Sequence, residues 1–170
     1  MDFAPLLLGK DVRASSRSRA VLQYVGDQER FDELFSLLLH HERLLVVRAA
    51  DAIEKVTLTR PEFLVPHKMQ LLSLLKSALH KELKWHIALL ITRVSLNAAE
   101  LKEVWRTLSY WAQNPNERKI VRIHALQGLS DLARLHSDQQ DGFEQVLDAM
   151  AHEQIPSLQA RIKKLRKPKH

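Results

Sequence analysis

The chain contains no cysteine, and this absence excludes several kinds of chemistry at once. Without thiols there is no disulfide framework, no cysteine nucleophile and no zinc site with cysteine ligands. A chain without cysteine also fits a reducing compartment. The fold therefore has to be held by packing rather than by disulfide bonds.

Long apolar runs and glycine-rich loops are missing as well. No uninterrupted apolar run approaches the roughly 20 residues that a membrane-spanning helix needs. The four glycines stand singly, so no glycine-rich loop is present to hold a phosphate. Residues 1–8 lack the basic segment of a secretory signal. We therefore expect a cytoplasmic protein without membrane contact.

The usual catalytic motifs are absent from the sequence. It contains neither a Gly-x-Ser-x-Gly elbow nor a His-Glu-x-x-His helix. Acids that are adjacent in sequence, such as Asp32 and Glu33, do not converge on one face of a helix. We expect no enzyme, no cofactor and no resident metal, because an active site would have to be assembled from residues far apart in the chain.

What the chain does contain is an internal repeat, whose three copies begin at the evenly spaced positions Leu45, Leu83 and Val121. The copies align without gaps, and their apolar residues have helical spacing. They are Leu45-x-x-x-Ala49-x-x-Ala52-Ile53-x-x-Val56, Leu83-x-x-x-Ile87-x-x-Leu90-Ile91-x-x-Val94 and Val121-x-x-x-Ala125-x-x-Gly128-Leu129-x-x-Leu132. Such a repeat is typical of stacked helix pairs, in which small residues let the helices approach closely.

The pattern along the chain predicts an all-α fold. No stretch alternates apolar and polar residues for long, so we expect no strands. Asn97 and Glu100 form the sequence signature of a capping box, and Pro66 predicts a bend or a restart within a helical segment. We expect an α-α superhelix of about four helix pairs with one leading helix near residues 11–25. The predicted boundaries are a lead-in over 1–10, one domain over 11–166 and a basic tail over 167–170.

The second helices resemble those of HEAT-repeat proteins in the armadillo-like superhelix group, in particular small bacterial members of unassigned activity. The family motif is Val-Arg-x-x-Ala-x-x-x-Leu, and Val121-Arg122-x-x-Ala125-x-x-x-Leu129 matches it. Leu83-Lys84-x-x-Ile87-x-x-x-Ile91 fits less well. In the first repeat, the position of the basic residue is occupied by Val46. The aspartate usual before the second helix is not evident. The resemblance covers about residues 31–165 and implies a fold and a binding style without one shared activity.

In such a superhelix the second helices line a concave face that binds a partner. We therefore predict a non-catalytic scaffold that holds a protein or peptide. The residues expected to line the face are Arg48, Asp51, Lys55, His86, Leu89, Arg93, Arg122, His124 and Gln127. Leu89 would supply an apolar contact there.

Three residues share one register position of the repeat and invite a more specific function. Arg48, His86 and His124 occupy the same place in successive copies, so stacked helices could align them in a column. No carboxylate shares that column, which disfavours a metal site. The residues are therefore either partly buried beside the core or a column of partner contacts. Of the three tryptophans, core packing is the expectation for Trp105 and Trp111, whereas Trp85 is expected nearer the surface.

Charge is concentrated at one end of the sequence. Residues 161–170 hold six basic side chains and no acidic one, whereas the rest of the chain has 20 of each. Nucleic-acid binding is therefore the alternative function, as in HEAT-like proteins that repair alkylated DNA. It would use a basic stripe and the tail; the residues are Lys84, Arg93, Lys119 and Arg122, then Arg161, Lys163, Lys164, Arg166, Lys167 and Lys169. Otherwise the stripe is a mixed, solvated face, and the tail is a capping helix that pairs with acids of the preceding repeat.

Overall fold

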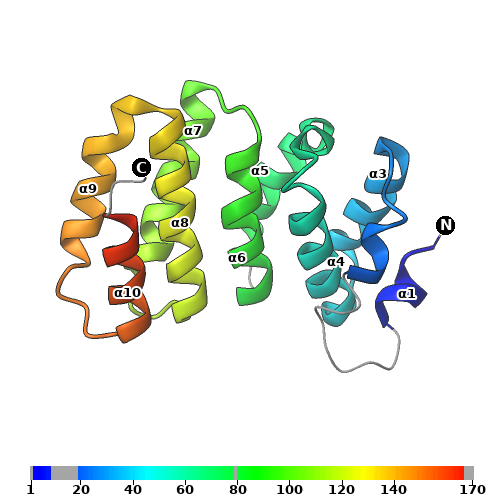
Figure 1. Cartoon of the computed structure of the whole chain (residues 1–170), viewed down its shortest axis with the longest axis horizontal. Coiled ribbons are helices and arrows are strands. Elements are labelled where there is room, and N and C mark those ends of the chain that lie inside the picture. Colours follow the sequence, from blue (N-terminus) through cyan, green and yellow to red (C-terminus); the bar gives the residue numbers. More distant parts are fainter. Residues whose placement is uncertain (1, 9–18, 79, 167–170) are drawn as a thin grey trace. The chain divides into compact units, whose positions relative to one another are not determined.

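The computed structural model describes residues 2–8, 19–78 and 80–166 (Figure 1). Within these ranges the chain forms helices joined by turns, and no described residue lies in a strand. The prediction of an all-α fold is confirmed. The helices group into two compact units, residues 1–68 and 69–170, a division that the predicted single domain over 11–166 did not include. The predicted tail, residues 167–170, and most of the leading helix lie outside the described residues.

Unit 1 is built around helix α4. Its described elements are a helical stretch at residues 19–22, helices α1 (Ala4–Leu8), α3 (Gln28–Ser36) and α4 (Arg43–Val56), and 3₁₀ helices η1 (Leu37–Leu39) and η2 (Pro61–His67). α4 packs against α1, α3 and η1. Asp27 caps α3 by accepting a hydrogen bond from the Arg30 N–H at 2.9 Å, as a carboxylate at this position commonly does.

Aromatic side chains fill the part of this core between α3 and η2. Phe31 lies 6.1 Å from Phe35 and 5.3 Å from Phe63, measured between ring centroids. All three are buried, and the tilted arrangement is one that aromatic rings favour.

Pro66 lies within η2, and α5 begins at Lys68, so the predicted restart of the helix near Pro66 is confirmed.

Unit 2 contains the remaining helices and is the more regular of the two units. Its elements are α5 (Lys68–Ser77), α6 (Lys81–Leu90), η3 (Ile91–Arg93), α7 (Ala98–Gln113), α8 (Lys119–Leu135), η4 (Ser137–Gln139), α9 (Gln140–Ala149) and α10 (Pro156–Leu165). The first residue of α5 falls at the end of unit 1. The predicted capping box at the start of α7 is confirmed: Glu100 N–H donates to Asn97 Oδ1 at 2.9 Å, and Asn97 N–H donates to Glu100 Oε2 at 2.8 Å.

Helix α8 is the centre of unit 2 (Figure 1). It packs against α6, α7, α9 and α10, and its buried residues include Val121, Ala125 and Leu129 of the repeat motif. The helices α6 and α8, the second helices of two successive predicted pairs, therefore pack directly against each other within this unit.

The contact between α6 and α8 is close enough to require a glycine. A Cβ atom built on Gly128 would lie 2.5 Å from the Ala88 carbonyl oxygen and 3.1 Å from Leu108 Cδ1. Real Cβ atoms do not approach a backbone oxygen so closely, so any larger residue at position 128 would force the two helices apart. The predicted role of Gly128 in close helix approach is confirmed.

No helix among the described residues is both long enough and apolar enough to cross a membrane.

Candidate partner-binding face

An aromatic pair joins α6 and α8. The Trp85 ring on α6 stacks on the His124 ring on α8, with 6.2 Å between centroids and 28° between planes. His124 is oriented by its own helix, because its Nδ1 lies 2.8 Å from the Ile120 carbonyl oxygen. Both rings are partly exposed. The close approach of the two backbones at Ala88 and Gly128 brings these side chains within stacking distance.

Two further predicted residues extend this surface. Leu89 lies one helical turn after Trp85, and Gln127 lies one turn after His124, so each shares the face of its neighbour. Both are partly exposed. We call the surface formed by Trp85, Leu89, His124 and Gln127 the α6–α8 face.

A polar network borders the α6–α8 face on the side of α10. Arg161 Nη1 on α10 donates to Gln127 Oε1 at 2.9 Å, and Gln127 Nε2 donates to Asp131 Oδ1 at 2.9 Å. Asp131 also forms an ion pair with Arg134. The network fixes the orientation of the Gln127 amide, which makes this edge of the face rigid.

Arg122 does not line an open face, which corrects the prediction for this residue. Its side chain is only 1% exposed. Nε donates to the Ala112 carbonyl oxygen at 2.8 Å, near the end of α7, and Nη2 forms an ion pair with Glu153. The guanidinium fits this position because it supplies several donors in a fixed plane to two partners at once. Arg122 therefore joins α8 to the loop before α10.

Lys84 occupies the equivalent position in the preceding copy of the repeat and, like Arg122, forms an ion pair with a glutamate. Lys84 forms an ion pair with Glu117, and its Nζ lies 5.4 Å from the centroid of the Trp111 ring. Glu117 and Glu153 both lie just before the second helix of the following pair. The positive stripe predicted for nucleic acid is thus neutralised at two of its four members, whereas Lys119 is exposed. The recurrence of Glu117 and Glu153 ahead of these helices is a sequence signal for the two ion pairs, and the prediction of an open basic stripe did not take it into account.

Arg48 and His86 are also buried, which corrects their predicted place on an open surface. Arg48 is 5% exposed, and its Nη1 donates to the Leu7 carbonyl oxygen in the last turn of α1. A cation at that point complements the carbonyl end of a helix. His86 is 4% exposed and lies beside Trp85, with 5.4 Å between ring centroids. Arg48 belongs to unit 1 and the two histidines to unit 2.

Asp51 and Lys55 lie together on α4 in unit 1. They form an ion pair across one helical turn, and each side chain is about a quarter exposed. A pair of this kind stabilises its own helix by a few tenths of a kcal/mol, roughly 0.2–0.5 kcal/mol. The two charges are therefore largely satisfied by each other.

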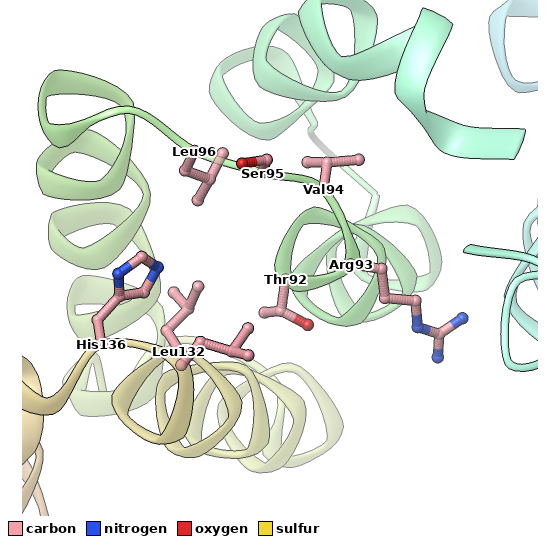
Figure 2. Close-up of a pocket in the computed structure, with 8 residues that line it drawn as sticks. Thr92, Arg93, Val94, Ser95, Leu96, Leu132 and His136 are labelled. Atoms are coloured by element: carbon pink, nitrogen blue, oxygen red, sulfur yellow. The ribbon is translucent and has the colours of Figure 1, made fainter. Parts of the chain in front are cut away.

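Arg93 borders a pocket of about 310 Å³ at the ends of η3 and α8 (Figure 2). The pocket is lined by Thr92, Arg93, Val94, Ser95, Leu96, Leu132, Leu135 and His136. Figure 2 shows the Arg93 side chain pointing away from Leu96, Leu132 and His136. Thr92 Oγ1 is already used, since it donates to the Leu89 carbonyl oxygen at 2.8 Å. None of the lining residues is a carboxylate, and the pocket does not gather charged groups around a common point.

A polar network in unit 1 was not predicted from the sequence. His67 stacks on Phe35, with 4.0 Å between centroids and 18° between planes, and its Nε2 lies 2.6 Å from Asp32 Oδ1. Gln28 Nε2 donates to the same oxygen at 2.7 Å and to the Phe63 carbonyl oxygen at 3.0 Å. These bonds fasten η2 to α3.

The same network shifts the acidity of Asp32. Desolvation raises the pKa of Asp32, but the hydrogen bonds from Gln28 and His67 and the charge of His67 together outweigh it, so the pKa lies below its usual value. The carboxylate is therefore held ionised, as the partner of a buried imidazole. The sequence gives no sign of this network, because His67 and Asp32 are 35 residues apart and do not belong to the repeat.

Within the described residues, no group of three or more histidine, aspartate or glutamate side chains is arranged to hold a metal ion. The chain also matches no family model, no curated protein and no solved structure. The resemblance to HEAT repeats therefore rests on the repeat motif in the sequence.

Proposed function

We propose that the chain is a HEAT-like superhelical scaffold that binds a protein or peptide through the α6–α8 face. The observation that carries the proposal is the partly exposed Trp85–His124 stack, which spans two helices held together at Gly128. Aromatic side chains are enriched at protein interfaces, and tryptophan is prominent among the residues that dominate binding energy. The stack would serve as an anchor presented by a rigid support.

The composition of the face favours a protein over other ligands. Its members are two aromatic rings, an aliphatic side chain and an amide, and none of them carries a full charge when histidine is neutral. Charged residues are depleted at the centre of protein interfaces, and polar residues form the rim. The network from Arg161 through Gln127 to Asp131 supplies such a rim on one side.

The first experiment identifies a partner and measures its affinity. The tagged full chain is used to isolate interacting proteins, and each candidate is purified and titrated against the chain. Trp85 is the reporter: binding at this face should shift its emission, and the Trp85→Phe variant should lose that change while Trp105 and Trp111 remain. A partner that binds equally well without any change at Trp85 would argue against this face.

A charge-introducing variant then tests the face itself. Leu89→Glu with His124→Glu should weaken binding at least tenfold, because two charges would be buried without partners in the interface. The matched control is Met69→Glu with Tyr110→Glu, which changes two residues that are 68% and 63% exposed in the same unit. The control should stay within about twofold of the parent chain, and both variants are checked for unchanged melting before use. Equal weakening by the two variants would contradict the proposal.

A further inference from the structure

Two basic side chains of the repeat motif form ion pairs within the fold. Lys84 pairs with Glu117, and Arg122 pairs with Glu153. The excess positive charge of the chain lies in residues 161–170, which carry six basic side chains and no acid. The described part of this segment consists of the last turns of α10 and the residue that follows it, Arg166.

One side of α10 is fixed against the rest of unit 2. Leu158 and Ile162 are 0% and 4% exposed, and α10 packs against α8. Arg161 donates to Gln127, and Arg166 forms an ion pair with Asp148 of α9. The second of these confirms the expectation that part of the basic segment 161–170 pairs with acids of the preceding repeat. The helix is therefore a docked element of the fold, and its orientation is set by α8.

The other side of α10 presents lysines to solvent. Lys163 and Lys164 are exposed, and neither forms an ion pair or hydrogen bond with another described residue. Arg166 lies beside them, and its pair with Asp148 is largely exposed, at 39% and 73% of the two side chains. Exposed pairs of this kind contribute about 0–1 kcal/mol, so an anion of higher charge density can replace Asp148.

We propose that the exposed side of α10, centred on Lys163, Lys164 and Arg166, binds the phosphate backbone of duplex DNA without reading its sequence. The charge complementarity carries the proposal: basic side chains follow one another along a docked helix and meet a polyanion of regular, high charge density. This binding is separate from the proposed protein-binding face.

Three features of α10 favour this partner over others. No large exposed apolar residue lies on α10, whereas a protein interface has an apolar centre. Its apolar side is buried against α8, so it has no apolar surface left to enter a lipid bilayer. Residues 156–170 contain no phenylalanine, tryptophan or tyrosine, so there is no platform to stack the bases of a single strand.

The test measures the salt dependence of DNA binding by the full chain. A fluorescein-labelled duplex of about 20 base pairs is titrated at several salt concentrations between about 50 and about 200 mM, where electrostatic binding changes most clearly. Each phosphate contact contributes about 0.9 to the slope of log affinity against log salt. The slope is negative, and Lys163→Gln with Lys164→Gln should make it shallower by about 2. Over this range of salt, the parent chain should therefore lose on the order of tenfold more affinity than the variant.

A matched variant separates a local effect from the loss of total charge. Lys102→Gln with Arg106→Gln removes the same charge from two exposed side chains on α7, outside the predicted basic stripe, and should leave the slope within experimental error of the parent. Equal slopes for the parent and the α10 variant, equal losses in both variants, or no binding of the parent at low salt would each overturn the proposal. Displacement of the duplex by vesicles of phosphatidylcholine and phosphatidylserine at a lower charge concentration than by unlabelled duplex would also overturn it, in favour of a membrane.

Discussion

Unit 1 and unit 2 both bury cationic side chains, but they do so in different ways. In unit 2, Lys84 and Arg122 occupy the same position of the repeat, and each pairs with a glutamate just ahead of the next second helix. In unit 1, the corresponding position is Val46, which is buried. The buried cation there is Arg48, which donates to a carbonyl of α1, and η2 is fastened through His67 and Asp32.

This difference shows which part of the repeat is regular. The apolar stripe recurs in all three segments, whereas the ion pair with a glutamate recurs only in the two segments that belong to unit 2. Apolar contacts tolerate a change of neighbour, because burial is not directional. A buried cation needs an acceptor at one defined place, so its partner must recur along with it.

The tryptophans make it possible to test the two units separately. Trp85, Trp105 and Trp111 all lie in unit 2, and residues 1–68 contain none. Tryptophan fluorescence therefore reports on unit 2, whereas far-ultraviolet circular dichroism reports on the helices of both. A variant that affects only one unit should separate these two signals.

The largest expected effect comes from removing the most buried tie. Arg122→Met should lower the free energy of unfolding of unit 2 by about 3 kcal/mol, because Glu153 and the Ala112 carbonyl oxygen lose their donor. Lys84→Met should cost about half as much, since Lys84 has a single ion-pair partner and its side chain is 17% exposed. Denaturant titration followed by tryptophan fluorescence measures both. If Lys84→Met were the more costly change, the two ties would not be ranked by burial as we infer.

Two glycines in unit 2 give the next largest contrast. Gly128→Ala should destabilise unit 2 by about 2 kcal/mol, because the new Cβ would meet the Ala88 carbonyl oxygen at 2.5 Å. Gly142→Ala in α9 should instead stabilise it by up to about 1 kcal/mol, since alanine favours a helix and the added Cβ would be in ordinary contact with Trp105, 3.5 Å from Cζ2. The same fluorescence titration applies to both, and a change of the same sign in the two variants would be inconsistent with this packing.

The smallest expected effect is confined to unit 1 and depends on pH. The pKa of Asp32 is lower in the folded chain than in the unfolded one, so the ionised carboxylate stabilises the fold above its usual pKa of about 4. That contribution is lost as the pH falls through the lower, folded pKa. Because the Asp32 side chain is 48% exposed, Asp32→Asn should cost only about 0.5 kcal/mol near neutral pH, and the difference from the parent should shrink towards zero in acid.

Circular dichroism melting between neutral pH and about pH 3 measures this effect, in a range that spans the pKa of aspartate. Glu62→Gln is the matched control, because the pKa of Glu62 is also lowered, by its hydrogen bond with Arg60, but Arg60 is 46% exposed whereas His67, the partner of Asp32, is 10% exposed. The control should differ from the parent by less than Asp32→Asn does at neutral pH, because solvent screens an exposed pair more strongly. A pH-independent difference between parent and Asp32→Asn would show that the charge of Asp32 does not stabilise η2.

Local features of the fold could be predicted because they depend on residues close together in sequence. A few neighbouring residues were enough to predict the capping box at Asn97, the restart after Pro66 and the small residue at position 128. The even spacing of the repeat was also sufficient to predict that the second helices of successive pairs pack together in unit 2. The same register gave Leu89, His124 and Gln127 their partly exposed positions, but it wrongly placed Arg48, His86 and Arg122 on an open surface as well.

The sequence by itself determined the helices, their apolar stripes and the positions that recur, because helical spacing places residues on a common face whatever lies opposite. Only the tertiary structure decided which of those positions are covered. Arg48 meets a carbonyl 41 residues away, and Arg122 meets a glutamate 31 residues away. The partners lie on other elements, so burial converts a basic stripe on a helix into internal ion pairs and leaves the exposed charge of unit 2 to residues such as Lys163 and Lys164.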